Sequence, residues 1–362
     1  MKPARPSIRF CLAIEHGIWK QRDAAAAVER TFGLARLADE AGMDSLWLTE
    51  DPDGWDAFAL LGAMARETSR LRLGTGVTNA FNRSPNQIAA STATLDRMSG
   101  GRAFLGIGRG QPEIYGRVFG DDVTHPLQRL ADTIGLLRQW WSGEGVAHGD
   151  GLVDGASWRR TILPVSRPPI YIAAVGPKAL RLAGEIADGV LFNELATPAF
   201  VRLAVETVHN AARAVNRDPT RLQFFVNPAV TVTDDPAPVL ERKKATVALI
   251  HALPGMDRLL MSDNWDVSEI MARVRELMKT RETLSDGGHF FEIMRDGDLE
   301  AAREVIPSGL VAEASAVGPL EYVKSRIVEY QNAGATHLFL NRRGIPADVG
   351  ELASQLNALR TS

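Results

Sequence analysis

Acidic, amide and basic side chains recur directly after short apolar segments of the chain, where strands of a parallel sheet would end. These side chains are Glu15, Glu50, Asp51, Asn79, Arg109, Gln111, Glu113, Asn193 and Glu194. Carboxyl groups that face one cavity raise one another's pKa through desolvation and repulsion, so one of them can donate a proton near neutral pH. For any one of them, a solvated residue or a helix N-cap is the plain alternative.

A second chemical signal is a possible anion site. The apolar segment 169–174 leads directly into Gly176, Pro177, Lys178 and Ala179, at the expected start of a helix. Free N–H groups, the helix dipole and the lysine ammonium together favour a phosphate, although a plain strand-to-helix turn explains the same residues. The glycines of 106–110 would let a flat ring or a chain of phosphates approach the backbone. They lack the spacing of a dinucleotide-binding loop.

Several other kinds of chemistry find little support. The 7 histidines are scattered and form no metal-ligand motif, so no metal site is expected. No serine-hydrolase elbow occurs. The single cysteine, Cys11, has no second thiol with which to pair and is expected to be a core residue of a strand. The chemistry that the sequence still supports is proton transfer by carboxylates and the binding of a small ligand that carries phosphate.

These residues need a scaffold, and alternating apolar and helical patterns predict one. Strands are expected at 8–14, 45–48, 71–78, 103–107, 169–174, 189–192, 222–233 and 336–341. Helical patterns separate most of them, and eight parallel strands can close into a (β/α)8 TIM barrel with its site at the carboxyl ends of the strands. An open doubly wound sheet is the alternative.

We expect one domain over residues 1–362, with a helical insertion at about 254–307 between strands 7 and 8. The insertion is rich in methionine, leucine and aromatic residues. They would either roof a substrate pocket or pack on the barrel or across a dimer interface.

Composition narrows the possible partners. The chain has 362 residues, 45% hydrophobic and 23% charged, with a net charge of -3. These values are typical of a globular protein, and without a block of basic residues nucleic acid is an unexpected partner. The longest apolar run, 170–175, is far shorter than a membrane span or a secretory signal requires. A cytoplasmic protein without membrane contact is therefore expected.

Four stretches resemble the luciferase-like monooxygenase superfamily in order and spacing. They are 46–51 (LWLTED), 74–79 (GTGVTN), 101–108 (GRAFLGIG) and 169–174 (PIYIAA). The following segments, 176–184 (GPKALRLAG) and 187–190 (ADGV), look most like the branch that uses the deazaflavin coenzyme F420. That branch includes methylenetetrahydromethanopterin reductase. The resemblance covers about 8–233 and returns at 319–341, and it implies a luciferase-like α/β fold, the (β/α)8 TIM barrel.

The resemblance also implies roles for particular residues. The branch has an Asp-His pair after strand two, followed by a Trp; here the pair is Glu50-Asp51, Trp55 keeps the spacing, and the His is missing. The family also has a non-proline cis peptide in strand three, which would fall near Gly76-Val77. The implied catalytic residues are Glu15, Asp51, Trp55 and Glu113. The implied cofactor-binding residues are Glu50, Gly76, Val77, Asn79, Gly108, Arg109, Ala174, Gly176, Pro177, Lys178, Ala179 and Asn193.

The activity that follows from the resemblance is hydride transfer between the deazaflavin and a small organic substrate, through a carbonyl, imine or activated alkene carbon. The first alternative is an FMN-dependent monooxygenase of the same fold, which would need a reductase partner. The second is a protein that binds F420 without catalysis. A homodimer is an expectation from the family.

Overall fold

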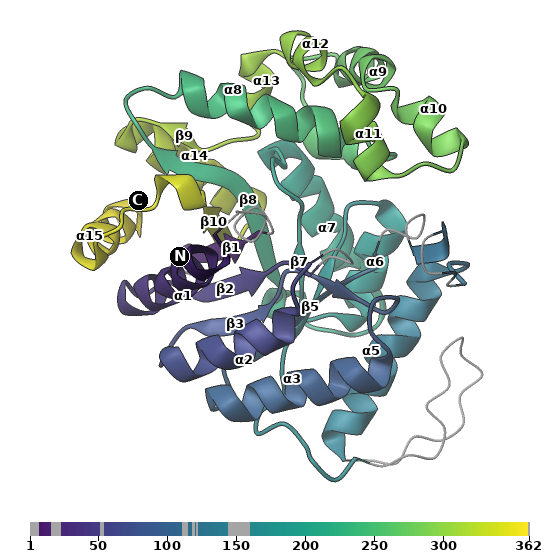
Figure 1. Ribbon diagram of the computed structural model, residues 1–362, viewed down its shortest axis with the longest axis vertical. Coiled ribbons are helices and arrows are strands. Elements are labelled where there is room, and N and C mark those ends of the chain that lie inside the picture. The colour runs from purple at the N-terminus through teal and green to yellow at the C-terminus, as the bar shows by residue number, and fades with distance from the viewer. Residues whose placement is uncertain are drawn as a thin grey trace.

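The chain folds into a closed barrel of parallel strands in this computed structural model, which describes residues 7–15, 23–50, 54–110, 115–117, 120, 122–143 and 160–360. The sheet order is β10-β1-β2-β3-β5-β6-β7-β8-β9, and β10 also pairs with β8, which closes the ring (Figure 1). The strands are β1 (Arg9–Ile14), β2 (Ser45–Leu48), β3 (Arg72–Thr75), β4 (Thr78–Asn79), β5 (Ala103–Gly108), β6 (Ile170–Ala173), β7 (Gly189–Leu191), β8 (Gln223–Val232), β9 (Val317–Gly318) and β10 (His337–Leu340). The expected TIM barrel is confirmed, and the open sheet was the wrong alternative.

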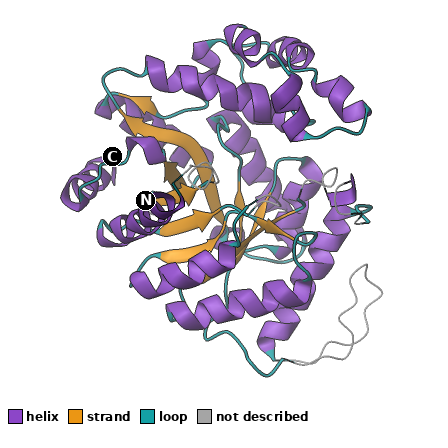
Figure 2. Cartoon of the chain, viewed as in Figure 1, coloured by secondary structure: helices purple, strands orange, loops and turns teal. Residues whose placement is uncertain are grey.

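Helices cover the outside of the barrel (Figure 2). They are α1 (Ala24–Glu40), α2 (Ala57–Glu67), α3 (Pro85–Ser99), α5 (Pro126–Ser142), α6 (Pro177–Ile186), α7 (Pro198–Ala214), α14 (Leu320–Ala333) and α15 (Val349–Arg360). Side-chain caps start several of them: Asp23 accepts from the Ala26 N–H, Asp56 from the Ala59 N–H, and Ser84 forms a capping box with Gln87. Each cap fixes where the chain turns from the mouth of the barrel into a helix.

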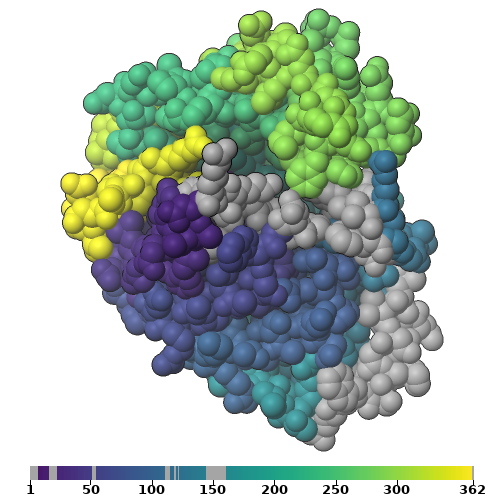
Figure 3. Space-filling model, viewed as in Figure 1, coloured from purple at the N-terminus to yellow at the C-terminus, as the bar shows by residue number. Residues whose placement is uncertain are grey.

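The insertion between barrel strands 7 and 8 is present, and it is helical over a longer stretch than 254–307. It contains α8 (Ala237–Thr246), α9 (Val267–Leu277), α10 (Thr280–Ser285), α11 (Phe290–Asp296), α12 (Leu299–Glu304), α13 (Ser308–Glu313), a π-helical turn (Val247–His251) and a 3-10 helix (Met256–Leu260). These helices form a lobe beside the barrel (Figure 3). Their apolar residues pack into a cluster of their own, which Leu195 and Ala229 of the barrel join.

Aromatic side chains fill the barrel interior. Trp47, Phe104, Tyr171 and Phe225 pack in one cluster, which also contains Cys11, and the ring centroids of Trp47 and Phe104 are 4.4 Å apart. Cys11 is buried, as expected, and burial raises the pKa of its thiol. The barrel interior is thus filled by side chains, so a ligand site is expected at an end of the barrel.

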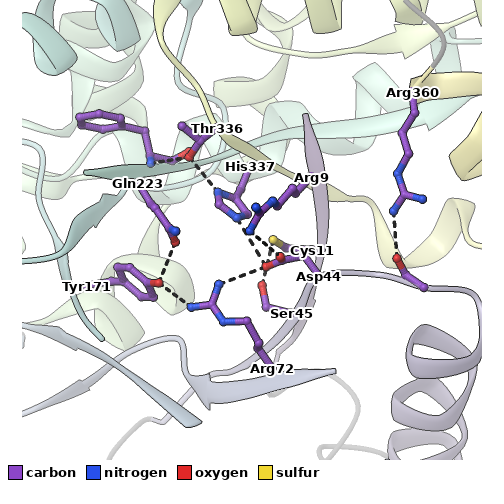
Figure 4. Close-up of polar contacts among 12 residues, drawn as sticks. Arg9, Cys11, Asp44, Ser45, Arg72, Tyr171, Gln223, Thr336, His337 and Arg360 are labelled. Atoms are coloured by element: carbon purple, nitrogen blue, oxygen red, sulfur yellow. Dashed lines mark hydrogen bonds and ion pairs between the residues drawn. The ribbon is translucent and has the colours of Figure 1, made fainter. Parts of the chain in front are cut away.

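A polar cluster closes the amino-terminal end of the barrel (Figure 4). Asp44 lies within 3.5 Å of His337 and 3.4 Å of both Arg72 and Arg9. Burial alone would raise the pKa of Asp44, but the hydrogen bond and charge of His337 and the two arginines lower it to about 2. In TIM barrels this end serves stability, because the site lies at the other one.

Two further observations complete the fold. The guanidinium of Arg360, in α15, donates to the Gly42 carbonyl at 2.9 Å, so the last helix is tied to the turn before β2 (Figure 4). Within the described ranges, no helix combines the length and apolar character that crossing a bilayer requires.

Candidate active site

The carboxyl ends of the strands bring the sequence-predicted residues to one mouth. Glu15 is exposed at the end of β1, Arg109 is exposed after β5, and Asn193 is exposed after β7. Trp55, just before the N-cap of α2, is 44% exposed. The predicted catalytic residues Asp51 and Glu113 lie outside the described residues.

An apolar patch lies between β4, β5 and β6 at this mouth. The non-proline cis peptide implied by the resemblance is present at Gly76-Val77, between β3 and β4. A Cβ added to Gly108 would lie 3.2 Å from Val77 Cγ2 and 3.5 Å from Ala173 Cβ, so these three residues are in close proximity. Ala174, the residue after β6, is buried. A side chain at position 108 would press against Val77 and Ala173. Because the residue is a glycine, no side chain projects from the patch at this position.

Glu50 holds the segments beside this patch in place. Its side chain is 2% exposed and accepts from the Thr78 hydroxyl and from Arg83 Nη2, the latter at 2.7 Å. Arg83 also donates to Asp56 at 2.6 Å. Burial alone would raise the pKa of Asp56, but the hydrogen bond and charge of Arg83 and the backbone N–H groups of α2 lower it. The Glu50 carboxylate therefore connects the end of β2 to β4 and to the start of α3.

Asn79 is engaged in a similar way. Its Nδ2 donates to the Tyr115 hydroxyl at 2.8 Å, and its Oδ1 accepts from the N–H groups of Phe81 and Asn82. The ring of Tyr115 stacks on Phe81 with centroids 5.5 Å apart. The amide thus shapes the turn after β4, and Tyr115 holds the segment after β5 against that turn.

The N-terminus of α6 is the predicted anion site. Gly176 is its N-cap and makes no side-chain cap, Pro177 has no N–H, and the first helical bond is from Leu180 N–H to the Gly176 carbonyl. Among the described residues, neither the N–H groups of Lys178 and Ala179 nor the Lys178 ammonium has a hydrogen-bond acceptor. A groove of about 240 Å³ adjoins Lys178 between α5 and α6. Its lining residues are Leu127, Gln128, Ala131, Lys178, Arg181, Leu182 and Glu185.

The structure adds polar residues that the sequence analysis did not assign to the site. Lys243, in α8, forms an ion pair with Glu194, and the two side chains are 18% and 17% exposed. Below them, His251 is buried in the π-helical turn. Asn193 Oδ1 accepts from the Glu194 N–H at 2.7 Å. Glu194 was recognisable as a residue after a strand, whereas nothing in the local pattern distinguishes Lys243, Arg83 or Tyr115.

The insertion is fastened to the loop after β7. The Thr197 N–H donates to the Leu259 carbonyl at 2.8 Å, and its hydroxyl donates to the Met261 carbonyl at 2.7 Å. On the segment after β5, Arg117 donates to the Gly287 carbonyl. The insertion therefore contacts segments that follow two different strands of the mouth.

His251 predicts a pH dependence of stability. Burial lowers the pKa of His251 to about 4, whereas the unfolded histidine titrates near its ordinary value of 6.5. The unfolded chain therefore binds a proton first, and as the pH falls from 6.5 to 4 this residue alone removes up to about 3 kcal/mol of stability. Urea denaturation over this range should give a shallower loss for His251→Gln. The exposed His125→Gln is the control, and equal slopes for all three proteins would contradict the prediction.

Comparisons with known proteins place this barrel in a family. The model of the luciferase-like monooxygenase family matches residues 8–337, so the chain belongs to that family. The chain is 33% identical over 219 residues to a 5,10-methylenetetrahydromethanopterin reductase of Methanolobus tindarius, covering 60% of this chain and 66% of that protein. It is 35% identical over 174 residues to an F420-dependent glucose-6-phosphate dehydrogenase of Microbacterium testaceum, covering 44% and 50%.

A solved structure shares the fold over nearly the whole length. It is the coenzyme F420 dependent tetrahydromethanopterin reductase from Methanopyrus kandleri, with a TM-score of 0.74 and 22% identity over 97% of each chain. By contrast, the chain spans only about two thirds of the reductase from Methanolobus and half of the dehydrogenase.

Proposed function

We propose that this protein is an F420-dependent oxidoreductase that moves a hydride between the deazaflavin and a small organic substrate with a carbonyl, imine or activated alkene carbon. The observation that carries the proposal is the uncapped N-terminus of α6 with Lys178, at the same end of the barrel as the flat patch of Val77, Gly108 and Ala173. The names of its relatives, which specify F420, support the choice of cofactor.

The residues fit the two chemical parts of such a cofactor. The N–H groups of Lys178 and Ala179 and the ammonium of Lys178 would hold the phosphate, and Arg109 would add positive charge. The patch of Val77, Gly108 and Ala173 would support one face of the ring system. When bound, the deazaflavin supplies a carbon that gives or accepts a hydride.

The remaining residues of the mouth would prepare this chemistry. Glu50 and Asn79 hold the segments around the patch through their hydrogen bonds, so they act as positioning residues in this proposal. The insertion contacts the mouth and would limit the access of water. Glu15 and Trp55 are accessible at the mouth, where they would contact substrate and shape proton delivery. Asp51 and Glu113 keep the same proposed role on the resemblance alone.

The direct test of the proposed function is an anaerobic absorbance assay of F420H2 oxidation. Cyclohexanone, cyclohexenone and pyrroline serve as carbonyl, activated alkene and imine probes. We expect one class to oxidise the reduced cofactor in proportion to enzyme concentration. Tight binding of F420 without turnover on any class would instead support a binding protein, and oxygen-dependent turnover with reduced FMN would support a monooxygenase.

Replacing Lys178 by alanine should weaken F420 binding about tenfold, which corresponds to about 1.4 kcal/mol for one lost charge-assisted contact. The measurement is a fluorescence titration of F420 with the wild type and the variant. Lys324→Ala is the matched control, because Lys324 lies on α14 and pairs with Glu321. Equal affinity of Lys178→Ala and the wild type would remove the α6 terminus from the cofactor site.

A further inference from the structure

The ion pair of Glu194 and Lys243 joins the barrel mouth to the insertion. Glu194 follows β7 at the carboxyl end of the barrel, and Lys243 reaches it from α8. Lys243 donates to only one oxygen of the carboxylate, Oε1, and the described residues offer no donor to Oε2. The Glu194 side chain is 17% exposed, so the protein does not enclose it completely.

Glu15 is a second carboxylate at this mouth whose charge affects the pair. It follows β1, and β8 and β10 lie between β1 and β7 in the ring. Its negative charge raises the pKa of Glu194. Glu15 is exposed, and it forms no ion pair within the described part of the chain. The negative charge of Glu15 therefore favours the protonated form of Glu194, whereas the Lys243 ammonium favours its carboxylate.

Glu194 lies at the same mouth as the patch proposed to support the cofactor, and it follows the strand next to that patch, because β7 pairs with β6. Val77, Gly108 and Ala173 lie on the side of the ring formed by β4, β5 and β6, whereas Glu15 and Glu194 follow β1 and β7. The insertion, which supplies Lys243, lies on the side of Glu194. A substrate bound beside this patch would thus lie next to the strand end that carries Glu194.

We propose that Glu194 is a catalytic residue that exchanges the substrate's proton, and that Lys243 is a positioning residue for Glu194. This inference rests on the proposed hydride transfer and deepens it by assigning the proton. The substrate it favours is one whose reacting carbon is double-bonded to oxygen or nitrogen, because such a group needs a proton on the heteroatom.

The proposed step balances. In the direction of reduction, a hydride with its two electrons forms a C–H bond at the carbonyl or imine carbon, and the π electrons move to the heteroatom. The carboxyl O–H of Glu194 breaks as the heteroatom–H bond forms, leaving a carboxylate beside Lys243. The substrate is reduced and the deazaflavin is oxidised. In the reverse direction the same carboxylate accepts the hydroxyl or amine proton.

The electrostatics of the pair agree with this role. Burial raises the pKa of Glu194, Lys243 acts in the opposite direction, and the charge of Glu15 raises the pKa further. His251, in the turn that follows α8, is also buried, and it is neutral at neutral pH because burial lowers its pKa. Lys243 thus stabilises the carboxylate once the proton has left. Burial and the charge of Glu15 oppose it, so Lys243 alone does not set the pKa of Glu194.

Infrared difference titration of the protein alone tests the inference without a substrate. We expect the wild type to show a protonated-carboxyl band that disappears at a higher pH than the bands of the other carboxyl groups. The band should be missing in Glu194→Gln, shift to higher pH in Lys243→Met, and shift to lower pH in Glu15→Gln. The control Glu321→Gln changes an exposed carboxylate on α14 and should leave the band unchanged. Identical spectra of Glu194→Gln and the wild type would overturn the proposal.

Kinetics separate this inference from the proposed function. With whichever of the three probes the wild type turns over, Glu194→Gln should lower kcat by about 100-fold while F420 affinity stays the same. If the wild type turns over and Glu194→Gln matches it, the proton assignment fails and the proposed function stands. If the wild type neither binds nor oxidises F420H2, the proposed function fails, and the infrared result still decides whether Glu194 carries the proton.

Discussion

Replacing Gly106 by alanine is expected to lower the free energy of unfolding by about 3 kcal/mol or more, with loss of soluble protein at growth temperature. A Cβ at this position would lie 2.1 Å from the Thr75 carbonyl oxygen and 3.0 Å from Trp47 Cζ3. The neighbouring strand must therefore move. That movement also breaks the 2.6 Å hydrogen bond from the Thr75 hydroxyl to the Gly106 carbonyl. Urea denaturation of purified protein measures the effect.

Gly33 provides the matched control for this substitution. It lies inside α1, and a Cβ added there meets no atom within 4 Å. Alanine is favoured over glycine in a helix, so Gly33→Ala should stabilise the protein by about 0.5 to 1 kcal/mol. If Gly106→Ala were as stable as the wild type, the close packing of β5 on β3 described above would be incorrect.

Replacing Arg83 by methionine is expected to cost about 3 to 5 kcal/mol, because it leaves the carboxylate of Glu50 buried without a cation. Among the residues that the structure describes, the Thr78 hydroxyl alone would still donate to it. The variant should also bind F420 more weakly, since β4 and the start of α3 lose the group that ties them to the end of β2. Chemical denaturation and the fluorescence titration measure the two effects on the same preparation.

Two further variants make this prediction specific to a buried pair. The Arg36→Met variant breaks a surface ion pair with Glu67, whose partners are 43% and 38% exposed, and it should cost at most about 1 kcal/mol. In the double variant Glu50→Gln/Arg83→Met the buried charge is gone, so part of the lost stability should return. Equal effects of Arg83→Met and Arg36→Met would show that burial of the pair contributes nothing.

The barrel could be predicted from the sequence because its signal is local and repeated. Each strand is a short apolar segment, and a helical pattern follows most of them. The expected segment 71–78 corresponds to β3 and β4 with the cis peptide between them, which the resemblance implied and periodicity alone does not indicate. The common end of the strands then placed Glu15, Arg109 and Asn193 at one mouth.

The extent of the insertion was harder to predict. The helix α8 begins before 254 and has a single buried residue, Val239, so its sequence lacks the apolar stripe by which a helix is recognised. Its contribution to the mouth, the Lys243 ammonium, depends on contacts with Glu194, 49 residues away in sequence. No local pattern encodes such a pairing.

Glu50 shows a different limit of sequence reasoning. Its place after β2 predicted a polar residue at the mouth, where the structure places it, and the resemblance implied that it binds the cofactor. Its role depends on Arg83, 33 residues away, which occupies its carboxylate. The sequence therefore predicted where Glu50 lies, but its partner could be seen only in three dimensions.

The central claim is that F420 is the cofactor, and a comparative binding titration tests it most directly. Purified protein is titrated with F420 and, separately, with FMN, by fluorescence and calorimetry. We predict F420 binding with a Kd of about 1 μM or lower, equivalent to about 8 kcal/mol, and no comparable binding of FMN. Preference for FMN, or binding of neither compound, would contradict the account.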